Sequence, residues 1–126
     1  MKALRAGEAT IVLPYHVPNP LEGGEGVWVD FFGKPAYTMT LAGKLAQVKN
    51  VRALFFVGER LPNGRGFALH IAPISGCFNG DRAHDAALIN RNVEYWVRRF
   101  PSQYLFAYNR YKHPVGAVES PEMRGI

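Results

Sequence analysis

The chain is 126 residues long and 48% hydrophobic, a length and composition that fit one compact domain with a core and exclude wholesale disorder. Its single cysteine, Cys77, excludes an internal disulfide, and no apolar run approaches the roughly 20 residues that a membrane-spanning helix needs. The net charge of +5 indicates an anionic partner, which could be nucleic acid, an acidic protein, a phosphorylated ligand or a charged membrane surface.

The first residues predict the end of a helix whose body is not in this chain, and then a strand. Gly7 suits the C-cap of a helix that ends just before it. The run 9–13 is apolar and rich in β-branched residues, which predicts a strand covered on both faces. Such a strand would deliver His16 to its carboxyl end, where open α/β sheets bind their ligands. His16 is therefore a candidate site residue, and an ordinary hydrogen-bonded loop histidine is the alternative.

A strand, a tight turn and a helix are predicted for the central stretch. Apolar residues alternate over 27–31, a turn falls at Gly33-Lys34-Pro35, and apolar residues recur at helical spacing from Leu41 onward. Thr38 or Thr40 would cap this helix, because a threonine hydroxyl can accept a hydrogen bond from an unpaired N–H group of the first turn.

A β-hairpin is predicted next. Two apolar runs, 51–59 and 66–73, flank the segment Pro62-Asn63-Gly64, in which Asn and Gly accept positive φ. Arg60 falls where the first of these strands leaves the core. It is either a solvated turn charge or a residue that binds phosphate.

The pattern over 84–100 predicts a long helix with one apolar stripe. Asp81 or Asp85 can begin this helix, and Pro101 ends it. On its outer face, Glu94 and Arg98 lie one helical turn apart and can form an ion pair.

The last part of the chain is aromatic and basic. Alternation over 104–108 predicts a strand that runs out into Arg110 and Lys112, and residues 115–126 lack periodicity and are expected to form a mobile tail. Together the elements predict an α/β fold with a mixed sheet flanked by helices. Scattered cysteine and histidine residues lack the short paired spacing of metal ligands, so neither a metal nor a cofactor is predicted.

Three groups of residues resemble the lipid A biosynthesis acyltransferases, the lauroyl and myristoyl transferases within the lysophospholipid acyltransferase superfamily. The groups are Leu4-Arg5-Ala6-Gly7-Glu8 with Leu13-Pro14-Tyr15-His16, then Phe31 to Ala46, and then Asn90 to Val97 with Phe100-Pro101-Ser102-Gln103-Tyr104 and Asn109-Arg110-Tyr111-Lys112-His113-Pro114. The third group is the most specific, and the similarity covers nearly all of residues 4–116.

This resemblance implies acyl transfer from an acyl carrier protein thioester to a hydroxyl of a phosphorylated glucosamine lipid, at the cytoplasmic face of the inner membrane. In that family a His-x-x-x-x-Asp/Glu motif holds the general base and the carboxylate that orients it. Here none of the four histidines is followed by a carboxylate at the required position; the residues found there are Leu21, Ser75, Ile89 and Val118. The family's motif and membrane anchor lie N-terminal to the matched residues.

The resemblance therefore implies that residues 1–116 form the C-terminal part of an acyltransferase domain, peripheral to the membrane, with residues 117–126 as its tail. It assigns no catalytic residue. Matched position by position, Arg60, Thr38, Arg110 and Lys112 suit an anionic acceptor, because guanidinium and ammonium groups bind phosphate. A helix cap is the alternative role for Thr38. Tyr15 stands where the family usually has Asp, so no acceptor contact is assigned to it.

Two other functions stay open. A small basic module that binds nucleic acid would use the aromatic residues from Tyr104 to Tyr111 for stacking and the positive charge for phosphates. A non-functional remnant would fold poorly, because part of a sheet exposes strand edges. The first alternative predicts steep salt dependence of binding, and the second predicts loss of cooperative unfolding.

Overall fold

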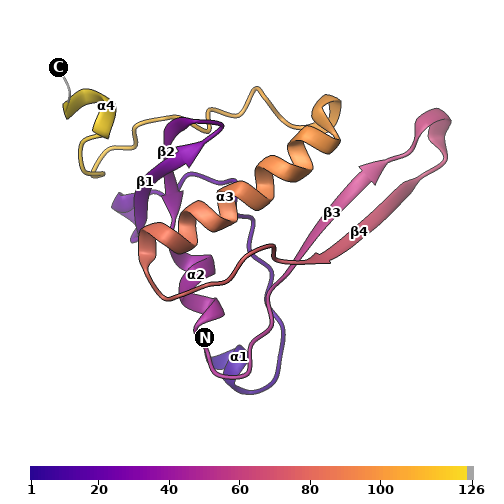
Figure 1. The fold of residues 1–126 in the computed structure, drawn as a ribbon, viewed down its shortest axis with the longest axis horizontal. Helices are drawn as coiled ribbons and strands as arrows, with labels where there is room; N and C mark the ends of the chain where they lie inside the picture. The colour runs from indigo at the N-terminus through magenta and orange to yellow at the C-terminus, as the bar shows by residue number, and fades with distance from the viewer. Residues whose placement is uncertain (125–126) are drawn as a thin grey trace.

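The computed structural model describes residues 1–124, which form two antiparallel hairpins and one long helix (Figure 1). The helices are α1 (Lys2–Arg5), α2 (Leu41–Ala46), α3 (Arg82–Arg99) and α4 (Pro121–Arg124). The strands are β1 (Gly26–Phe31), β2 (Lys34–Met39), β3 (Leu54–Arg60) and β4 (Phe67–Pro73), and short 3-10 turns lie at Pro20–Glu22, Pro62–Gly64 and Pro101–Gln103.

The predicted α/β class is confirmed, but the prediction of one mixed sheet is wrong. Among the described residues β1 pairs with β2 and β3 pairs with β4, which makes two separate two-stranded antiparallel sheets. Each pair is joined by a short connection, and short connections link antiparallel neighbours, whereas parallel strands need a long crossover. Figure 1 shows β1 and β2 behind α3, while the β3–β4 hairpin projects from the body of the molecule.

The turn predicted at Gly33-Lys34-Pro35 lies one residue earlier, at Phe32-Gly33, and a strand follows it instead of a helix. Phe32 and Gly33 both have positive φ, 52° and 76°, as a two-residue type I′ hairpin turn requires. The chain therefore folds back and Lys34 pairs with Phe31. Thr38 lies inside β2, so the prediction that it caps a helix is wrong. Thr40 occupies the N-cap position of α2, and its side chain makes no capping hydrogen bond.

Two other predicted strands are absent. Residues 9–13 have no strand partner among the described residues, and Ile11 is 70% exposed. A β-branched run becomes a strand only where a neighbouring strand pairs with it, and neither hairpin pairs with residues 9–13. Residues 104–108 form tight turns, in which the N–H groups of Phe106 and Tyr108 donate to the carbonyls of Tyr104 and Leu105.

The helix and the hairpin with the strongest local signals are confirmed. The Asp81 carboxylate accepts a hydrogen bond from the backbone N–H of His84 at 2.8 Å and so caps α3. Arg98 Nη1 lies 3.6 Å from Glu94 Oε2 on this helix. At the N-terminus, α1 ends as predicted, with Gly7 just beyond it at φ +84°. Local capping and turn chemistry thus fixed these elements.

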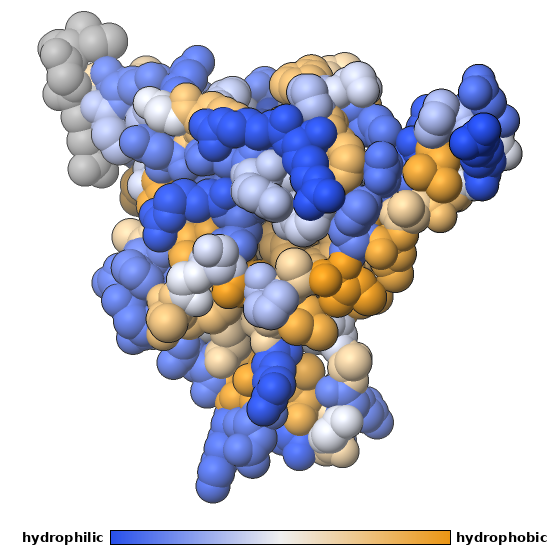
Figure 2. Space-filling model, turned by 45° about the vertical axis from the view of Figure 1, so that its right-hand side comes forward, coloured by the Kyte–Doolittle hydropathy of each residue, from blue (hydrophilic) through white to orange (hydrophobic). Residues whose placement is uncertain are grey.

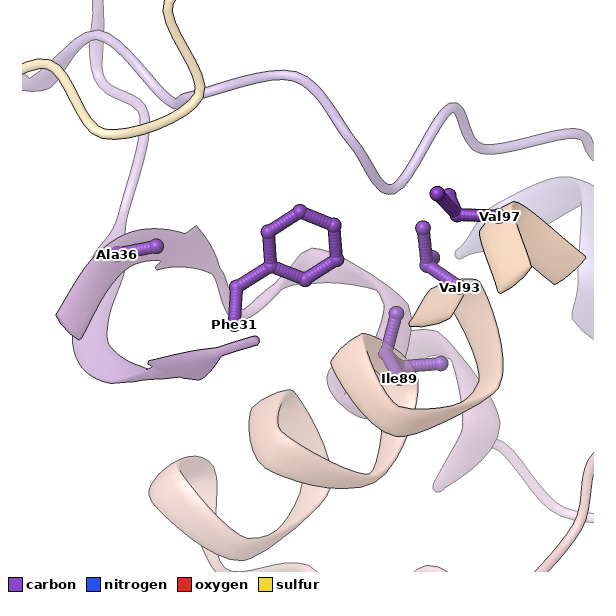
Figure 3. Close-up of a cluster of buried hydrophobic side chains, with 5 residues drawn as sticks. All are labelled: Phe31, Ala36, Ile89, Val93 and Val97. Carbon is purple, nitrogen blue, oxygen red and sulfur yellow. The ribbon is translucent and has the colours of Figure 1, made fainter. Parts of the chain in front are cut away.

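The core lies between α3 and the β1–β2 hairpin. Its buried side chains are Phe31, Ala36, Ile89, Val93 and Val97 (Figure 3). Figure 3 shows the Phe31 ring pointing from the hairpin toward the three α3 side chains. These contacts hold β2 and α3 together, and the two elements carry the polar groups described below.

The described part of the tail contacts the β1–β2 hairpin. Trp28 Nε1 donates a hydrogen bond to the Val118 carbonyl at 2.8 Å, and the Trp28 ring lies 4.9 Å from the His113 ring. Ser120 is buried. The mobility expected of residues 117–126 stays a prediction, and residues 125–126 lie outside the described part of the chain.

Candidate functional site: a buried arginine and a cationic rim

The candidate site is built around Arg110, whose side chain is only 3% exposed. Its Nη1 donates to the Tyr37 carbonyl at 2.8 Å, and its Nη2 donates to Thr38 Oγ1 at 2.8 Å and to Asn90 Oδ1 at 3.1 Å. Asn90 Nδ2 in turn donates to Thr38 Oγ1 at 3.0 Å. We call Thr38, Asn90 and Arg110 the arginine cluster; it ties the C-terminal segment to both β2 and α3.

The arginine cluster compensates the guanidinium charge with neutral oxygen atoms. None of the ion pairs within residues 1–124 involves Arg110. Burial lowers the pKa of Arg110 from its ordinary value, and the neighbouring Tyr104, Tyr108 and Tyr111 oppose that shift. A guanidinium stays protonated in proteins, so the cluster encloses a positive charge that no described carboxylate balances.

A groove of about 320 Å³ opens beside Arg110. Its lining includes Phe31, Phe32, Tyr104, Tyr108 and Arg110. The Tyr104 hydroxyl is buried and has no hydrogen-bond partner among the described residues. Burial raises the pKa of Tyr104, and the nearby Arg110 charge opposes that shift. An unpaired hydroxyl next to a buried cation gives the groove a local preference for a polar, negatively charged occupant.

His16 and Lys112 come together on the Tyr108 ring. The centroid of the His16 ring lies 5.7 Å from that of Tyr108, and Lys112 Nζ lies 5.7 Å from the Tyr108 centroid. The Tyr108 hydroxyl accepts a hydrogen bond from the Val17 N–H at 2.8 Å, which fixes the ring in place. We call His16, Tyr108 and Lys112 the cationic rim. The side chains of His16 and Lys112 are exposed.

The cationic rim and the arginine cluster are adjacent along the chain. The Arg110 N–H donates to the Tyr108 carbonyl at 2.9 Å, so one tight turn carries members of both groups. Four of the five residues selected from the sequence, Thr38, Arg110, His16 and Lys112, thus lie around this turn. Two of them are buried and bonded to each other, and two face outward.

Arg60 lies elsewhere, at the end of β3 on the projecting hairpin (Figure 1). Its backbone N–H donates to Gln103 Oε1 at 2.7 Å and its carbonyl accepts from Gln103 Nε2 at 3.1 Å. The Arg60 side chain is exposed. The structure therefore does not bring Arg60 together with the arginine cluster.

Two histidines contact carboxylates in space although neither has the spacing of the family motif. His70 Nε2 lies 2.9 Å from Glu59 Oε1, and His84 Nδ1 lies 3.0 Å from Asp85 Oδ1. Burial would raise the pKa of Asp85, but hydrogen bonds from His84 and from the N–H groups of Asn79 and Gly80 lower it below its usual value. Asp85 thus holds the loop before α3, which is a structural task.

Sequence reasoning missed Asn90, which is 1% exposed and joins Thr38 to Arg110. A signal was present, because Asn90 lies one turn before Val93 and so falls beside the apolar stripe of the helix. An amide in that position needs buried hydrogen-bond partners. Among residues 1–124, no group of His, Cys, Asp and Glu side chains gathers in a way that could hold a metal ion.

Comparisons with known proteins relate this chain to one family. Residues 1–113 match the profile of the bacterial lipid A biosynthesis acyltransferases. A lipid A biosynthesis lauroyltransferase of Escherichia coli (strain K12) is 32% identical over 114 residues, which cover 89% of this chain and 36% of that protein. The chain therefore spans about a third of the length of this curated relative. No helix in the described part of the chain is long and apolar enough to cross a membrane. On the extent of the profile match, the chain belongs to the bacterial lipid A biosynthesis acyltransferase family.

Proposed function

We propose that this chain is the acceptor-binding, non-catalytic part of a lipid A acyltransferase. The whole enzyme would transfer an acyl group from an acyl carrier protein thioester to a hydroxyl of a phosphorylated glucosamine lipid. Family membership over residues 1–113 supports an acyltransferase role in general. The missing His-x-x-x-x-Asp/Glu motif supports the absence of catalysis in this chain, since no histidine is followed by the orienting carboxylate.

The observation that carries the binding role is the cationic rim beside the groove. Lys112 is an exposed ammonium 5.7 Å from the ring centroid of Tyr108, a residue that lines the groove, and an ammonium acts on a phosphate as a point charge. His16 adds an exposed imidazole against the same Tyr108 ring. Below them, Thr38 and Arg110 act as positioning residues, because their hydrogen bonds hold the turn that carries Lys112.

The same proposal extends to location and boundaries. An enzyme whose acceptor is a lipid works at a membrane surface, so we propose that the chain acts peripherally at the cytoplasmic face of the inner membrane, with residues 1–116 as the C-terminal part of the acyltransferase domain. Arg60 remains a proposed phosphate contact on a separate face. Stacking of nucleic-acid bases is not favoured, since Tyr104 lies against Phe31 and Phe106 instead of lining an open strand.

The binding role is tested with a phosphorylated lipid A precursor in mixed vesicles and the purified chain. Lys112→Gln should weaken binding several-fold because it removes the exposed charge of the rim. The matched control is Lys49→Gln, which removes an exposed lysine that lies outside the groove and the rim. Equal loss in both variants, or equal binding of the dephosphorylated lipid, would show that the rim does not recognise phosphate.

Absence of catalysis is tested separately. Incubation of the chain with lauroyl acyl carrier protein and the phosphorylated acceptor should give no acylated product above the rate without protein. Turnover that rises with the amount of purified chain would contradict this part of the proposal.

A further inference from the structure

The projecting β3–β4 hairpin has a bare apolar face. Its strands alternate between half-buried and exposed residues, and the exposed set includes Phe56 at 46%, Phe67 at 76%, Leu69 at 64% and Ile71 at 61%. Figure 2 shows hydrophobic residues along this arm, between a hydrophilic tip and the body of the molecule. A strand that is apolar on both faces is typical of a sheet interior, whereas an isolated two-stranded hairpin is marginally stable.

The β4 edge of this hairpin is also open. The Leu61 N–H donates to the Gly66 carbonyl at 2.9 Å, which makes this pair a hydrogen-bonded one, and hydrogen-bonded and non-hydrogen-bonded pairs alternate along an antiparallel ladder. Phe67, Leu69 and Ile71 therefore direct their backbone N–H and C=O groups outward. The Gln103 contacts agree with this alternation. Arg60 is the β3 partner of Phe67, and its backbone N–H and C=O groups also point outward, since they are hydrogen-bonded to the Gln103 side chain.

A groove of about 810 Å³ runs along this open edge. One wall is β4 and the other is α3, and the residues that decide its character are Leu69, His70, Ile71, Arg91, Tyr95 and Arg99. The five β4 residues Leu69–Pro73 extend over roughly 17 Å at about 3.4 Å per residue, which is the length of an ordinary strand. Backbone groups on one wall and two arginines on the other suit an extended polypeptide.

We infer that the groove receives an extended segment of acyltransferase polypeptide from outside the region that this chain covers, paired as a strand with β4. The identified relative has 64% of its length outside the match, since the match covers 36% of it. The inference rests on the proposed function, because it takes the occupant from the rest of the same enzyme, whether that lies in the same polypeptide or in another.

The two walls specify the sequence pattern of the occupant. Side chains of a strand beside β4 alternate between the bare face and the α3 wall. On the bare face they continue the apolar row of Leu69 and Ile71. On the other side they meet Arg91 and Arg99, so acidic side chains fit there. The occupant is therefore a strand in which apolar residues alternate with acidic or polar ones.

The hydrophilic hairpin tip favours a polypeptide over a membrane as the occupant. A hairpin that dips into lipid needs an apolar end, but Figure 2 shows a hydrophilic tip. The connection between β3 and β4 is flanked by the exposed Arg60 and includes the exposed Arg65. Strand pairing also satisfies the outward backbone groups of Leu69 and Ile71, which lipid tails leave without hydrogen bonds. Membrane binding by this face and self-association of two copies are outcomes of the test below.

The experiment measures hydrogen exchange at the β4 amides with and without a probe. The probe is the E. coli lauroyltransferase polypeptide without its 114 matched residues, purified in detergent, and the E. coli matched segment serves as the reference partner. On addition of the probe, exchange at Leu69 and Ile71 should slow by roughly tenfold or more, while exchange at His70, already paired with Val57, should change less.

Two proline variants at paired positions of β3 and β4 distinguish the two edges of the hairpin. Leu69→Pro removes an outward N–H from β4, and Gly58→Pro removes the N–H of its partner on the opposite edge. Both should keep the hairpin, which amide protection at Val57 reports. Leu69→Pro should abolish the slowed exchange and complex formation, whereas Gly58→Pro should retain both.

Four results would overturn the inference. The first is that the probe binds the E. coli segment but not this chain, and the second is that the complex forms while the Leu69 and Ile71 amides exchange as before. The third is that these two amides become protected in the chain alone as its concentration rises. The fourth is that vesicles of phosphatidylethanolamine and phosphatidylglycerol protect the two amides without the probe. None of these results bears on Lys112 and phosphorylated lipid, so failure of the proposed function is recognised independently.

Discussion

At the scale of single residues, Arg110 is the side chain on which the candidate site depends. It is buried, and its hydrogen-bond acceptors are a carbonyl, a hydroxyl and a side-chain amide. Its guanidinium carbon lies 5.4 Å from the ring centroid of Phe31. Burying a charge among neutral dipoles costs free energy. Removing the charged group alone costs more, because its former hydrogen-bond partners stay buried without water.

Arg110→Met should therefore destabilise the fold strongly. The substitution leaves the Tyr37 carbonyl, Thr38 and Asn90 short of a donor, at about 1–3 kcal/mol for each buried group that stays unpaired. Urea unfolding followed by circular dichroism measures the loss. Arg52→Met, at an exposed arginine, is the control and should change the free energy of unfolding little. Equal losses in the two variants would argue against the cluster.

Asp85 makes the free energy of unfolding depend on pH in the acid range. Its pKa in the folded protein lies below its usual value, so as pH falls the unfolded chain takes up the proton first. The stabilisation is complete above the unfolded pKa of about 3.9 and is lost as pH falls below it. Asp85→Asn should thus lower the free energy of unfolding at pH 7, and the difference from wild type should shrink near pH 3.

Asp30→Asn provides the comparison for that pH series. Asp30 is an exposed carboxylate on β1, and its replacement should leave the free energy of unfolding nearly unchanged at both pH values. A difference between wild type and Asp85→Asn that stays constant from pH 7 to pH 3 would contradict the role assigned to the Asp85 charge.

At the scale of elements, the β1–β2 turn decides whether residues 34–39 form a strand. Gly33 has φ +76°, a conformation that an L side chain adopts at a cost of roughly 1–2 kcal/mol. Gly33→Val should lower the free energy of unfolding by about that amount. Gly58→Ala is the matched control, since an added Cβ meets nothing within 4 Å and φ is not positive there. Thermal melts of both variants would measure the contrast.

Elements with local signals could be predicted from the sequence, and elements that depend on distant partners could not. Asp81 and Pro101 bound α3, and Asn63-Gly64 sits in the β3–β4 connection, as their own chemistry requires. Residues 9–13 are rich in strand-favouring residues, as β3 is, yet they lack a strand partner among residues 1–124. Propensity describes a residue's fit to a sheet, while pairing depends on what the rest of the chain leaves open.

The same limit applies to the candidate site. Thr38 and Arg110 were selected by resemblance, but their contact joins residues 72 positions apart, and no local pattern predicts it. Thr38 faces the core because the type I′ turn places it in β2. Once β2 is known, the need for a buried donor becomes clear. The prediction of Thr38 as a helix cap is wrong because the turn lies at Phe32-Gly33, one residue earlier than predicted, and its type returns the chain as a strand.

At the scale of the whole molecule, the net charge of +5 should govern association with membranes. Binding to vesicles that contain anionic phospholipid should weaken as salt rises, because ions screen exposed charges beyond roughly 8 Å at physiological ionic strength. Co-sedimentation at increasing sodium chloride measures this, with purely zwitterionic vesicles as the control. Salt-independent binding to both kinds of vesicle would point to the apolar hairpin face as the membrane contact instead.

The hydrogen bond from the Trp28 indole to the Val118 carbonyl gives the chain a built-in optical reporter. The chain has only one other tryptophan, Trp96, which lies 5.6 Å from His70 near the projecting hairpin. In a Trp96→Phe background, fluorescence of the remaining indole would follow release of the C-terminal segment. In a Trp28→Phe background, it would follow arrival of a strand beside β4. Each half of the molecule can thus be watched separately without an added label.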